Sequence, residues 1–200
     1  MNKFSDKVQE YISTVFKDLK YSHKTILSIS FEECTFENCE FIESKFMNCR
    51  FIDCQFINCN LSVAKMDDST FRDVIFRNSK TSGLDWTKAA WPEIALSSSI
   101  KFIKCIINDS TFSGLQLNEI VIEQCQAYNV DFREGSFRHA NFRLSDLAGS
   151  LFNETDLGEA DFTDAINYQI DVNFNKIKGA KFSRQEAIRL LYSLGIELVD

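Results

Sequence analysis

A large apolar residue recurs at every fifth position along most of this chain, with a small residue two positions before it. The pattern is clearest at Phe36 and Phe41, which follow Cys34 and Cys39. A period of five matches neither the 3.6 residues of an amphipathic helix nor the two residues of a plain strand. It indicates an internal repeat, which decides the fold assignment. The first run of large positions, with Thr81 as its one weak member, is Ile26, Phe31, Phe36, Phe41, Phe46, Phe51, Phe56, Leu61, Met66, Phe71, Phe76, Thr81, Trp86 and Trp91.

A second run continues the period one residue out of phase. We expect one surplus residue in the region 93–101, with a bulge at Ser97 to Ser99. Residues 20 apart should stack, or 21 apart across this shift, which predicts that Phe112 lies over Trp91. The large positions of the second run are Phe102, Ile107, Phe112, Leu117, Ile122, Ala127, Phe132, Phe137, Phe142, Leu147, Phe152, Leu157, Phe162, Asn167, Val172, Ile177 and Phe182.

Strand geometry explains why the period pairs a large residue with a small one. Residues i and i−2 of an extended segment point to one side, and residue i−1 points to the other. If i and i−2 face inward, i+1 and i+2 can form a corner before the next inward pair. The interior then holds one large and one small side chain per repeat. A charge at a large position, as in Phe132→Asp, should therefore be severely destabilising.

The two ends of the chain differ from the repeat array, which we place at residues 11–182. Residues 1–10 are polar and form a separate N-terminal segment without a clear pattern. Residues 183–200 are expected to form a helix and a tail, because Ser183 and Glu186 have the spacing of a capping box. An apolar stripe follows at Ala187, Ile188, Leu190, Leu191 and Leu194. Such a helix would cover the open end of a stack of strands.

Composition and charge narrow the possible functions. The chain has 200 residues, a net charge of −7 and 44% hydrophobic residues, enough for a sizeable core. An acidic protein is not a generic nucleic-acid binder, so we expect no direct nucleic acid binding. No apolar run resembles a signal peptide or a membrane span, which indicates a cytoplasmic protein without membrane contact. Its seven cysteines should then be mostly thiols.

The residues that could support catalysis or metal binding do not form a known motif. All seven cysteines occupy the small inward position, and their spacing resembles no zinc site. His23 and His139 are the only histidines, and nothing near either marks it as a catalytic base. The chain has no Gly-rich dinucleotide loop, P-loop or nucleophile elbow. We therefore expect a protein that is not an enzyme and needs no cofactor, metal or catalytic residue.

Two acidic clusters are the best candidates for a surface that a partner contacts. On a rod about as thick as a duplex, outward carboxylates could mimic phosphates and bind a basic DNA-binding groove. The alternative is a solvated face that only keeps the protein soluble. The candidate residues are Glu32, Glu33, Glu37, Glu40, Glu43, Glu154, Asp156, Glu159, Asp161 and Asp164.

The repeat resembles that of the pentapeptide repeat family over roughly residues 11–182. Clear copies are Ala160-Asp161-Phe162-Thr163-Asp164 and Ala140-Asn141-Phe142-Arg143-Leu144. The resemblance implies an all-β fold, a right-handed quadrilateral β-helix with four repeats in each coil and about eight coils, ending in a C-terminal α-helix. At the spacing of neighbouring strands, about 4.8 Å, the array would be roughly 40 Å long.

The chain is also similar to the subgroup of this family that protects type II DNA topoisomerases from poisons, which includes Qnr and MfpA, and most of all to its AlbG-like branch. Three stretches carry this resemblance, residues 28–36, 85–92 and 182–198. It implies binding to DNA gyrase, with topoisomerase IV as a second candidate target. Because the period leaves no room for the projecting loops of Qnr proteins, we expect protection from an albicidin- or peptide-type toxin rather than a quinolone.

The resemblance further implies a homodimer joined through the C-terminal helix. The expected interface residues are Ile188, Leu191, Leu194, Ile196 and Leu198. Two other functions stay open at this point. One is a structural scaffold with an unrelated protein partner, and the other is a redox or metal sensor that uses the cysteines.

Overall fold

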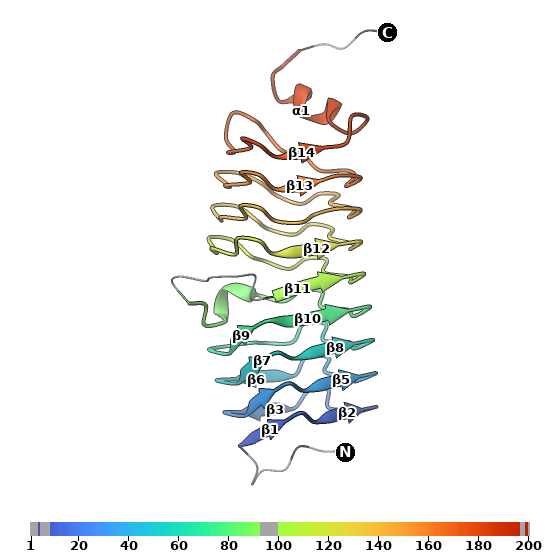
Figure 1. The fold of residues 1–200 in the computed structure, drawn as a ribbon, viewed down its shortest axis with the longest axis vertical. Helices are drawn as coiled ribbons and strands as arrows, with labels where there is room; N and C mark the ends of the chain where they lie inside the picture. The colour runs from blue at the N-terminus through green and yellow to red at the C-terminus, as the bar shows by residue number, and fades with distance from the viewer. Residues whose placement is uncertain (1–3, 5–8, 93–99, 197–198, 200) are drawn as a thin grey trace.

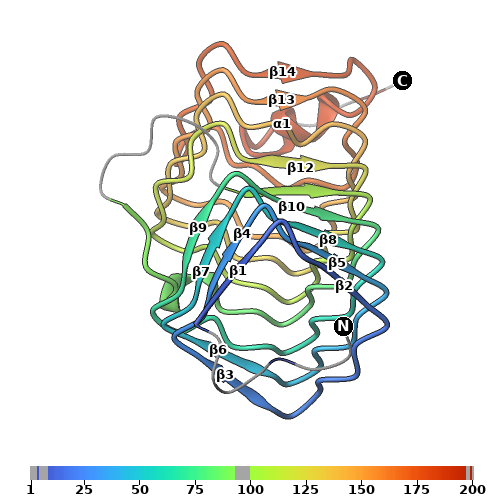
Figure 2. The same ribbon diagram turned by 60° about the horizontal axis from the view of Figure 1, so that its bottom comes forward.

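The chain folds into a parallel β-solenoid of about eight turns with one short helix at its C-terminal end, which confirms the predicted fold class. This computed structural model describes residues 4, 9–92, 100–196 and 199. The two ends of the chain lie at opposite ends of the rod (Figure 1). Viewed closer to the rod axis, each coil has four sides (Figure 2), which we name by an inward residue: side A by Phe31, side B by Phe36, side C by Phe41 and side D by Phe46.

Parallel pairing between successive coils builds sheets on three of these sides. Side A holds β1, β4, β7 and β9, and side D holds β3 and β6. Side B carries the longest sheet, β2, β5, β8, β10, β11 and β12, and the pair β13 and β14. The strands are β1 (Glu10–Ile12), β2 (Val15–Lys17), β3 (Thr25–Leu27), β4 (Ser30–Glu32), β5 (Thr35–Glu37), β6 (Lys45–Met47), β7 (Arg50–Ile52), β8 (Gln55–Ile57), β9 (Thr70–Arg72), β10 (Val74–Arg77), β11 (Ile100–Ile103), β12 (Val121–Glu123), β13 (Asp161–Phe162) and β14 (Lys181–Phe182).

The core is made of side chains that stack from coil to coil. The rings of Phe36 and Phe56 lie 4.5 Å apart with 10° between their planes, and the rings of Phe56 and Phe76 lie 4.7 Å apart. All three rings are fully buried. Stacking at this distance, repeated on each side, fills the rod interior without gaps for water.

The small inward position also makes a hydrogen bond that the sequence pattern did not predict. The Cys34 thiol donates to the Tyr11 carbonyl at 3.3 Å, and the Ser44 hydroxyl donates to the Tyr21 carbonyl at 2.7 Å. In both cases the acceptor lies in the preceding coil. This position therefore favours Cys, Ser and Thr because they combine small volume with a donor, which a buried carbonyl needs.

Most corners are formed by a residue in the left-handed backbone region, two positions after the large inward residue. Glu33, Asn38 and Glu43 have φ values of 51°, 54° and 53°, and the pattern recurs at every fifth position. Asn, Asp and Gly tolerate this region best, whereas a β-branched residue is strained there. Val63, with φ of 58°, is the β-branched residue at a described corner.

The phase shift between the two halves arises from six extra residues rather than one. Phe56 pairs with Phe76, and Phe76 pairs with Phe102, so the second interval is longer than the first by six positions. Trp86 stacks on Phe112 at 5.9 Å, so the prediction that Phe112 lies over Trp91 is wrong. The predicted bulge at 97–99 lies outside the described residues.

The extra length enters after Trp91. Trp91 still stacks on Phe71 of side A at 5.7 Å, and its indole N–H donates to the Trp86 carbonyl at 2.8 Å. The 3₁₀ helix η1 (Trp86–Lys88) lies in the same coil. Phe102 already belongs to side B, so the additional residues lie in the sequence between Trp91 of side A and Ile100 of side B. The inference that the period leaves no room for a projecting loop is therefore wrong.

The last full coil departs from the period at residues 167–172. Asn167 and Val172 were the predicted inward residues, but Tyr168 and Ile170 are buried instead, at 0% and 2% exposure. The pairing shows the cause. Ile166 bridges Asp146, one regular coil earlier, whereas Ile170 bridges Phe152, two positions short of a regular coil. The coil is therefore two residues shorter here, and Tyr168 and Ile170 become the inward residues.

The C-terminal helix α1 (Ile188–Tyr192) begins later than the sequence pattern predicts. The predicted capping box is wrong, because its two side chains bind the last coil instead. The Ser183 hydroxyl accepts from the Asp164 backbone N–H at 2.7 Å, and the Glu186 carboxylate accepts from the Asn167 backbone N–H at 3.2 Å. These bonds fasten the segment before α1 to the end of the solenoid.

A single aromatic side chain fills the core at the other end. Phe4 is 2% exposed and packs edge-on against Phe16 at 5.1 Å and Tyr21 at 4.8 Å. Phe4 therefore covers the core of the first coil. The sequence pattern predicts no core residue in the polar segment 1–10. Neither helix in the described ranges, η1 or α1, has the length and apolar character needed to cross a membrane.

Candidate partner surface

The corners of the solenoid carry many carboxylates and almost no positive charge. Lys104 is the only Lys or Arg among the described non-glycine residues with positive φ. Short acidic side chains tolerate the left-handed conformation, and a corner residue points away from the core, so its charge stays in solvent. The acidic corner residues are Asp18, Glu33, Glu43, Asp53, Asp68, Asp73, Asp109, Glu119, Glu134, Glu154, Glu159 and Asp164.

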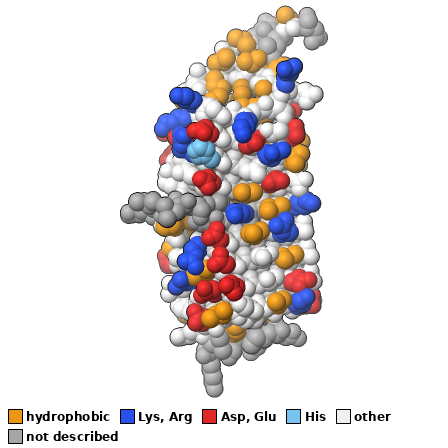
Figure 3. Space-filling view, in the orientation of Figure 1, with side chains coloured by type: hydrophobic (Ala, Val, Ile, Leu, Met, Phe, Trp, Pro, Cys, Tyr) orange, Lys and Arg blue, Asp and Glu red, His pale blue; other side chains and the backbone are white. Residues whose placement is uncertain are grey.

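Five of these carboxylates lie in one column along the corner between sides A and B, which we call the acidic edge. The backbone N–H of Glu33 donates to the Ile52 carbonyl, and that of Asp53 donates to the Arg72 carbonyl, so successive corners stack. Neighbouring coils are about 4.8 Å apart. Figure 3 shows acidic side chains in a broken column along the rod. The acidic edge consists of Glu33, Asp53, Asp73, Glu119 and Glu159, with His139 before Glu159.

The carboxylates of the acidic edge differ in whether a neighbouring side chain binds them. Glu33 accepts a hydrogen bond from the Ser13 hydroxyl at 2.7 Å, and Asp53 lies 3.9 Å from Arg72. Glu159 lies 3.5 Å from both Arg138 and His139. These ion pairs are solvent-exposed and contribute little to stability. Asp73 and Glu119 have no ion pair or side-chain hydrogen bond among the described residues, and their charge is available to a partner.

The six additional residues lie in the sequence between these two carboxylates. Asp73 follows Phe71 on side A, and Glu119 follows Leu117 at the same corner beyond the long coil. The free carboxylates and the departure from the regular coil thus occur at one place on the rod.

The structure spreads the ten acidic residues predicted from the sequence around the coil, because one repeat along the chain is one side around the rod. Glu32 and Asp156 lie on side A, Glu37 and Asp161 on side B, and Glu40 on side C. Glu33 and Glu159 belong to the acidic edge. The other three, Glu43, Glu154 and Asp164, lie at the three remaining corners.

Several of these ten carboxylates already have partners. Lys17 lies 2.6 Å from Glu37, and this hydrogen bond raises the pKa of Lys17. Asp156 is 3.4 Å from Arg138 and 3.8 Å from Lys176.

The acidic edge also includes Asp53, Asp73 and Glu119, which a search for clusters along the sequence missed. Their common feature is the corner position two after an inward residue of side A. Reading the sequence one coil at a time, with six positions added across the long coil, finds all three.

The C-terminal end carries an apolar surface of its own. Ile188, Leu191, Leu194 and Ile196 are 43%, 37%, 50% and 47% exposed. Figure 3 shows hydrophobic side chains gathered at this end of the rod. The fifth predicted interface residue, Leu198, lies outside the described residues. The side chains of Phe174 in the last coil and Tyr192 in α1 are also exposed, at 60% and 62%.

The seven cysteines are free thiols and are buried. Burial raises the pKa of the Cys49 thiol, whereas the side-chain hydrogen bond with Cys54 lowers the pKa of the Cys34 thiol to about 7. In the part of the chain that is described, no group of three or more His, Cys, Asp or Glu residues could hold a metal ion. The cysteine column therefore has the geometry of core packing and carbonyl hydrogen bonding.

Comparisons with known structures identify the same architecture. The chain is similar to QnrB1, a plasmid-mediated fluoroquinolone resistance protein, with 19% identity, a TM-score of 0.56, and coverage of 96% of this chain and 100% of QnrB1. It is also similar to HetL, a protein of heterocyst differentiation regulation from the cyanobacterium Nostoc, with 14% identity, a TM-score of 0.47, and coverage of 88% and 87%. Identities this low show the fold alone.

A comparison with curated protein sequences gave no match. The family description "Pentapeptide repeat region" matches residues 29–99 and 85–162, which together make up more than half of the chain. The matched residues contain the stacked rings, the small donors and the left-handed corners described above. The chain belongs to the pentapeptide repeat family.

Proposed function

We propose that this protein is a DNA mimic that binds DNA gyrase and protects it from a topoisomerase poison. The observation that carries the proposal is the acidic edge. One strand of B-DNA presents a phosphate about every 3.4 Å of helix axis. The edge has a corner position about every 4.8 Å, and five of the described positions from Glu33 to Glu159 hold a carboxylate, so its negative charge forms a column that is sparser than that of one DNA strand. A basic groove that binds DNA is complementary to such a column.

In the proposed mechanism the protein occupies the DNA-binding groove of gyrase and catalyses no reaction. The rod takes the place of a bound DNA segment or lies beside it, so that the poison is displaced or its cleaved complex relieved. No reaction on the poison is required, and the buried cysteines and exposed histidines have no part in it. Topoisomerase IV, which binds DNA in a similar groove, is a second candidate target.

The choice of poison rests on the sequence resemblance to the AlbG-like branch. The argument from missing loops is wrong, because the long coil has six residues more than a regular one. An albicidin- or peptide-type toxin remains the proposed poison on the resemblance alone. A quinolone must therefore be tested beside it rather than set aside.

We also propose a homodimer joined at the C-terminal end. Isolated exposed apolar side chains are normal, but a contiguous group at the end of a rod is typical of an interface. Phe174, Leu191 and Leu194 contribute to such a group. Two copies joined there would double the length of the rod. Leu191→Asp should give monomers in light scattering, and an unchanged mass would contradict this seam.

The function is tested with gyrase supercoiling and cleavage assays containing albicidin or a fluoroquinolone. We expect the wild-type protein to relieve at least one poison at micromolar concentration. The variant Asp73→Lys/Glu119→Lys reverses both unpaired charges of the acidic edge. It should lose protection by at least about tenfold, because a like charge would face a basic groove.

A matched control separates the edge from net charge. Glu134→Lys/Glu154→Lys reverses two exposed corner carboxylates between sides D and A, and neither makes an ion pair within the described residues. This control should protect like the wild type. If both double variants protect equally well, the acidic edge is not the contact. If the wild type neither inhibits gyrase nor relieves a poison, the proposed function is wrong.

A further inference from the structure

Positive charge gathers at mid-rod on side B and the adjoining part of side C, although the chain has a net charge of −7. Four Lys and Arg residues lie there in two successive coils, and none of them has an ion pair or a side-chain hydrogen bond with a described residue. Figure 3 shows Lys and Arg side chains beside hydrophobic ones at this level. We call this surface the basic face, and its cations are Arg77 in β10, Lys80 on side C, Lys101 in β11 and Lys104 at the corner between sides B and C.

Strand pairing brings these cations close together. Arg77 pairs with Ile103 and Lys101 pairs with Ile75, so the two cations lie diagonally across β10 and β11. Lys104 follows Ile103 directly and takes the left-handed corner conformation, with φ of 56°. Neighbouring strands are about 4.8 Å apart, and residues two apart on one face of a strand are about 6.6 Å apart. An acidic segment of a few residues can therefore contact several of these cations at once.

The carboxylates that project from side B nearest to the basic face are already bound. Glu37, on the N-terminal side, lies 2.6 Å from Lys17. Glu123, on the C-terminal side, accepts a hydrogen bond from the Asn141 amide at 2.8 Å. The basic face therefore lies between satisfied polar pairs, and the described part of the chain leaves its charge without a counterpart.

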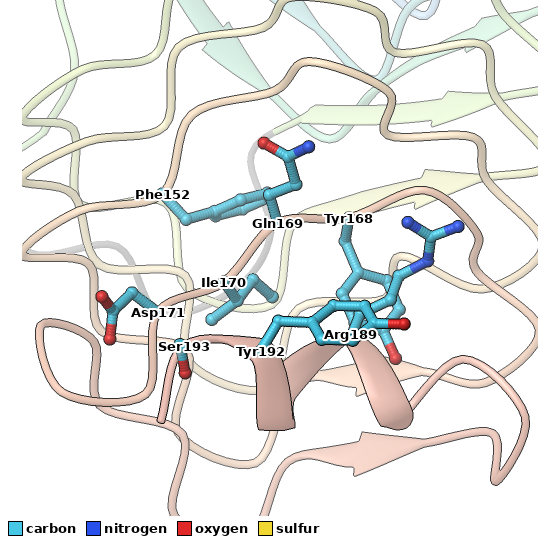
Figure 4. A pocket seen from close by; sticks show the side chains of 8 residues that line it. All are labelled: Phe152, Tyr168, Gln169, Ile170, Asp171, Arg189, Tyr192 and Ser193. Carbon is cyan, nitrogen blue, oxygen red and sulfur yellow. The ribbon is translucent and has the colours of Figure 1, made fainter. Parts of the chain in front are cut away.

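Several other cations of the rod differ in this respect. Arg189, which lines the pocket beside α1 (Figure 4), donates to the Glu186 carboxylate at 2.6 Å. Arg138 lies 3.4 Å from Asp156. A carboxylate from a partner would have to compete with a bound neighbour at these two sites, but not at the basic face.

Apolar side chains between the cations point to a protein partner. Ile75 and Ile103 face outward and are half-buried, and Ile106 is 38% exposed next to Lys80 of the neighbouring coil. Single exposed apolar residues are normal on a protein surface. Here each of the three adjoins an unpaired cation, and a mixture of apolar residues with arginine is typical of protein–protein interfaces.

The acidic edge disfavours a long polyanion at the same place. Asp73 directly precedes β10, and Glu119 lies two positions before β12, so both adjoin side B at its corner with side A. The phosphates of a nucleic acid continue beyond the basic face in both directions, and those near this corner would be repelled. A short acidic segment of a protein can place its carboxylates on the basic face alone.

We propose that the basic face binds an acidic segment of a partner protein, in which carboxylates flank apolar residues. The carboxylates pair with Arg77 and Lys101, and the apolar side chains pack on Ile75 and Ile103. The Arg77 guanidinium can hold one carboxylate through two parallel hydrogen bonds. This surface is separate from the acidic edge, and the inference rests on no part of the proposed gyrase binding.

The test titrates the full chain, labelled with ¹⁵N, with the peptide acetyl-Glu-Glu-Ile-Val-Glu-Glu-amide. When this peptide is extended, each of its faces presents an apolar residue between two carboxylates. We expect saturable NMR shifts centred on β10 and β11, and an affinity that falls as salt is added. The peptide acetyl-Gln-Gln-Ile-Val-Gln-Gln-amide keeps the shape without the charge and should bind at least about fivefold more weakly.

The variant Arg77→Gln/Lys101→Gln removes the two central charges and should weaken binding of the acidic peptide at least about fivefold. The matched control is Lys45→Gln/Lys65→Gln. It removes two exposed lysines that bridge one another on side D and likewise have no ion pair with a described residue. This control has the same net charge as the first variant and should bind the acidic peptide like the wild type.

The proposal is overturned if the acidic peptide shows no saturable binding up to about 10 mM, beyond the millimolar range of weak ligands. It is also overturned if the uncharged peptide binds equally well, or if the two double variants weaken binding equally, since net charge alone would then explain the attraction. Tighter binding of a short DNA duplex than of the acidic peptide would assign the basic face to phosphates instead. No assay in this series contains gyrase, so its failure is distinguishable from failure of the proposed function.

Discussion

The N-terminal and C-terminal halves of this rod reach the same cross-section by different local structures. Up to β10 the inward residues of sides A, B and D are mostly centres of short strands. Beyond β11, the described strands β12, β13 and β14 all belong to side B. On the other sides the coils there meet at isolated bridges followed by turns, for example Asp131 with Leu151. The stacking of the core is unchanged by this difference.

The residue before each inward centre explains the difference. In the C-terminal half it is often Asp or Asn, and its side chain accepts a hydrogen bond from the backbone N–H two residues later. Asp131 accepts from Arg133 at 3.0 Å, and Asp156 accepts from Gly158 at 3.0 Å. Such bonds fold the backbone into a turn. Further examples are Asn141, Asp146 and Asp161.

In the N-terminal half Asp or Asn is rarer at this position, although Asn60 accepts the same bond from Ser62. Several repeats there have a residue that favours extended backbone, such as Val15, Thr25 and Thr35. The comparison shows that carboxylates in the two halves have different tasks. Asp156 and Asp161 shape their own turns and are partly shielded by cations. Corner carboxylates such as Glu33 and Asp73 make no turn of this kind. Acidic residues close together in sequence are therefore not equivalent as candidates for partner binding.

The largest expected effect comes from the core that both halves share. Phe132 is fully buried and stacks between Phe112 at 5.5 Å and Phe152 at 5.0 Å. Phe132→Asp should destabilise the fold by more than about 4 kcal/mol, because it buries an unpaired charge. Urea unfolding followed by circular dichroism measures the loss. Phe132→Leu should cost much less, and equal stability of the aspartate variant and the wild type would refute the stacked core.

A mid-sized effect should separate the two kinds of carboxylate. Asp156→Ala removes the acceptor of the Gly158 N–H and should lower the free energy of unfolding by about 1–2 kcal/mol. Glu40 occupies the same position of its repeat in the N-terminal half, and Glu40→Ala should change stability by less than about 0.5 kcal/mol. Chemical denaturation of both variants checks this. Equal losses would show that the turn bonds do not distinguish the halves.

Replacing Val63 should stabilise the protein, because the other corners of the N-terminal half are mostly polar residues. Val63 has φ of 58°, a conformation in which its branched side chain is strained. Val63→Asn should stabilise the protein by about 1 kcal/mol, since Asn tolerates this region. The reverse change at an equivalent corner, Asn58→Val, should destabilise it by a similar amount. Thermal unfolding of both variants decides whether corner strain is the cause.

The smallest effect concerns acid stability in the C-terminal half. The side-chain hydrogen bond from Arg133 holds the pKa of Asp131 below its usual value. A carboxyl group whose pKa is lower in the folded than in the unfolded state stabilises the protein fully above the unfolded pKa, about 3.9. This stabilisation is lost as the pH falls through the folded pKa. The stability difference between wild type and Asp131→Asn should therefore shrink between pH 5 and pH 3. A difference that grows towards low pH would contradict this linkage.

Much of the fold could be predicted from the sequence because its period is set by side-chain volume. Phe and Leu at every fifth position, with Cys, Ser or Ala two before, leave few ways to fill a narrow interior. The phase shift was visible too, but its size was not. A shift of one residue and a shift of six give the same phase, and only the pairing of Phe76 with Phe102 distinguishes them.

The acidic surface was harder to predict for a related reason. Residues such as Glu32, Glu37 and Glu43 are close in sequence but lie on different sides and corners of the rod. Asp53 and Asp73 are a whole coil apart in sequence and neighbours in space. The structure at the end of the array could not be predicted from the capping-box spacing either. The Ser183 and Glu186 side chains accept hydrogen bonds from the last coil instead of capping the helix.

The long coil has a consequence for how this protein can change in length. The six additional residues lie between Trp91 and Ile100 in the sequence, and the pairing of β10 with β11 keeps the later coils in register. Doubling the number of residues in such a segment costs only about 0.6 kcal/mol in closure entropy. Insertions in this segment would leave the spacing of all other coils unaltered. A guest peptide inserted between Trp91 and Ile100 would lie at a fixed distance from both ends of the rod. This segment is therefore a suitable insertion site for engineering.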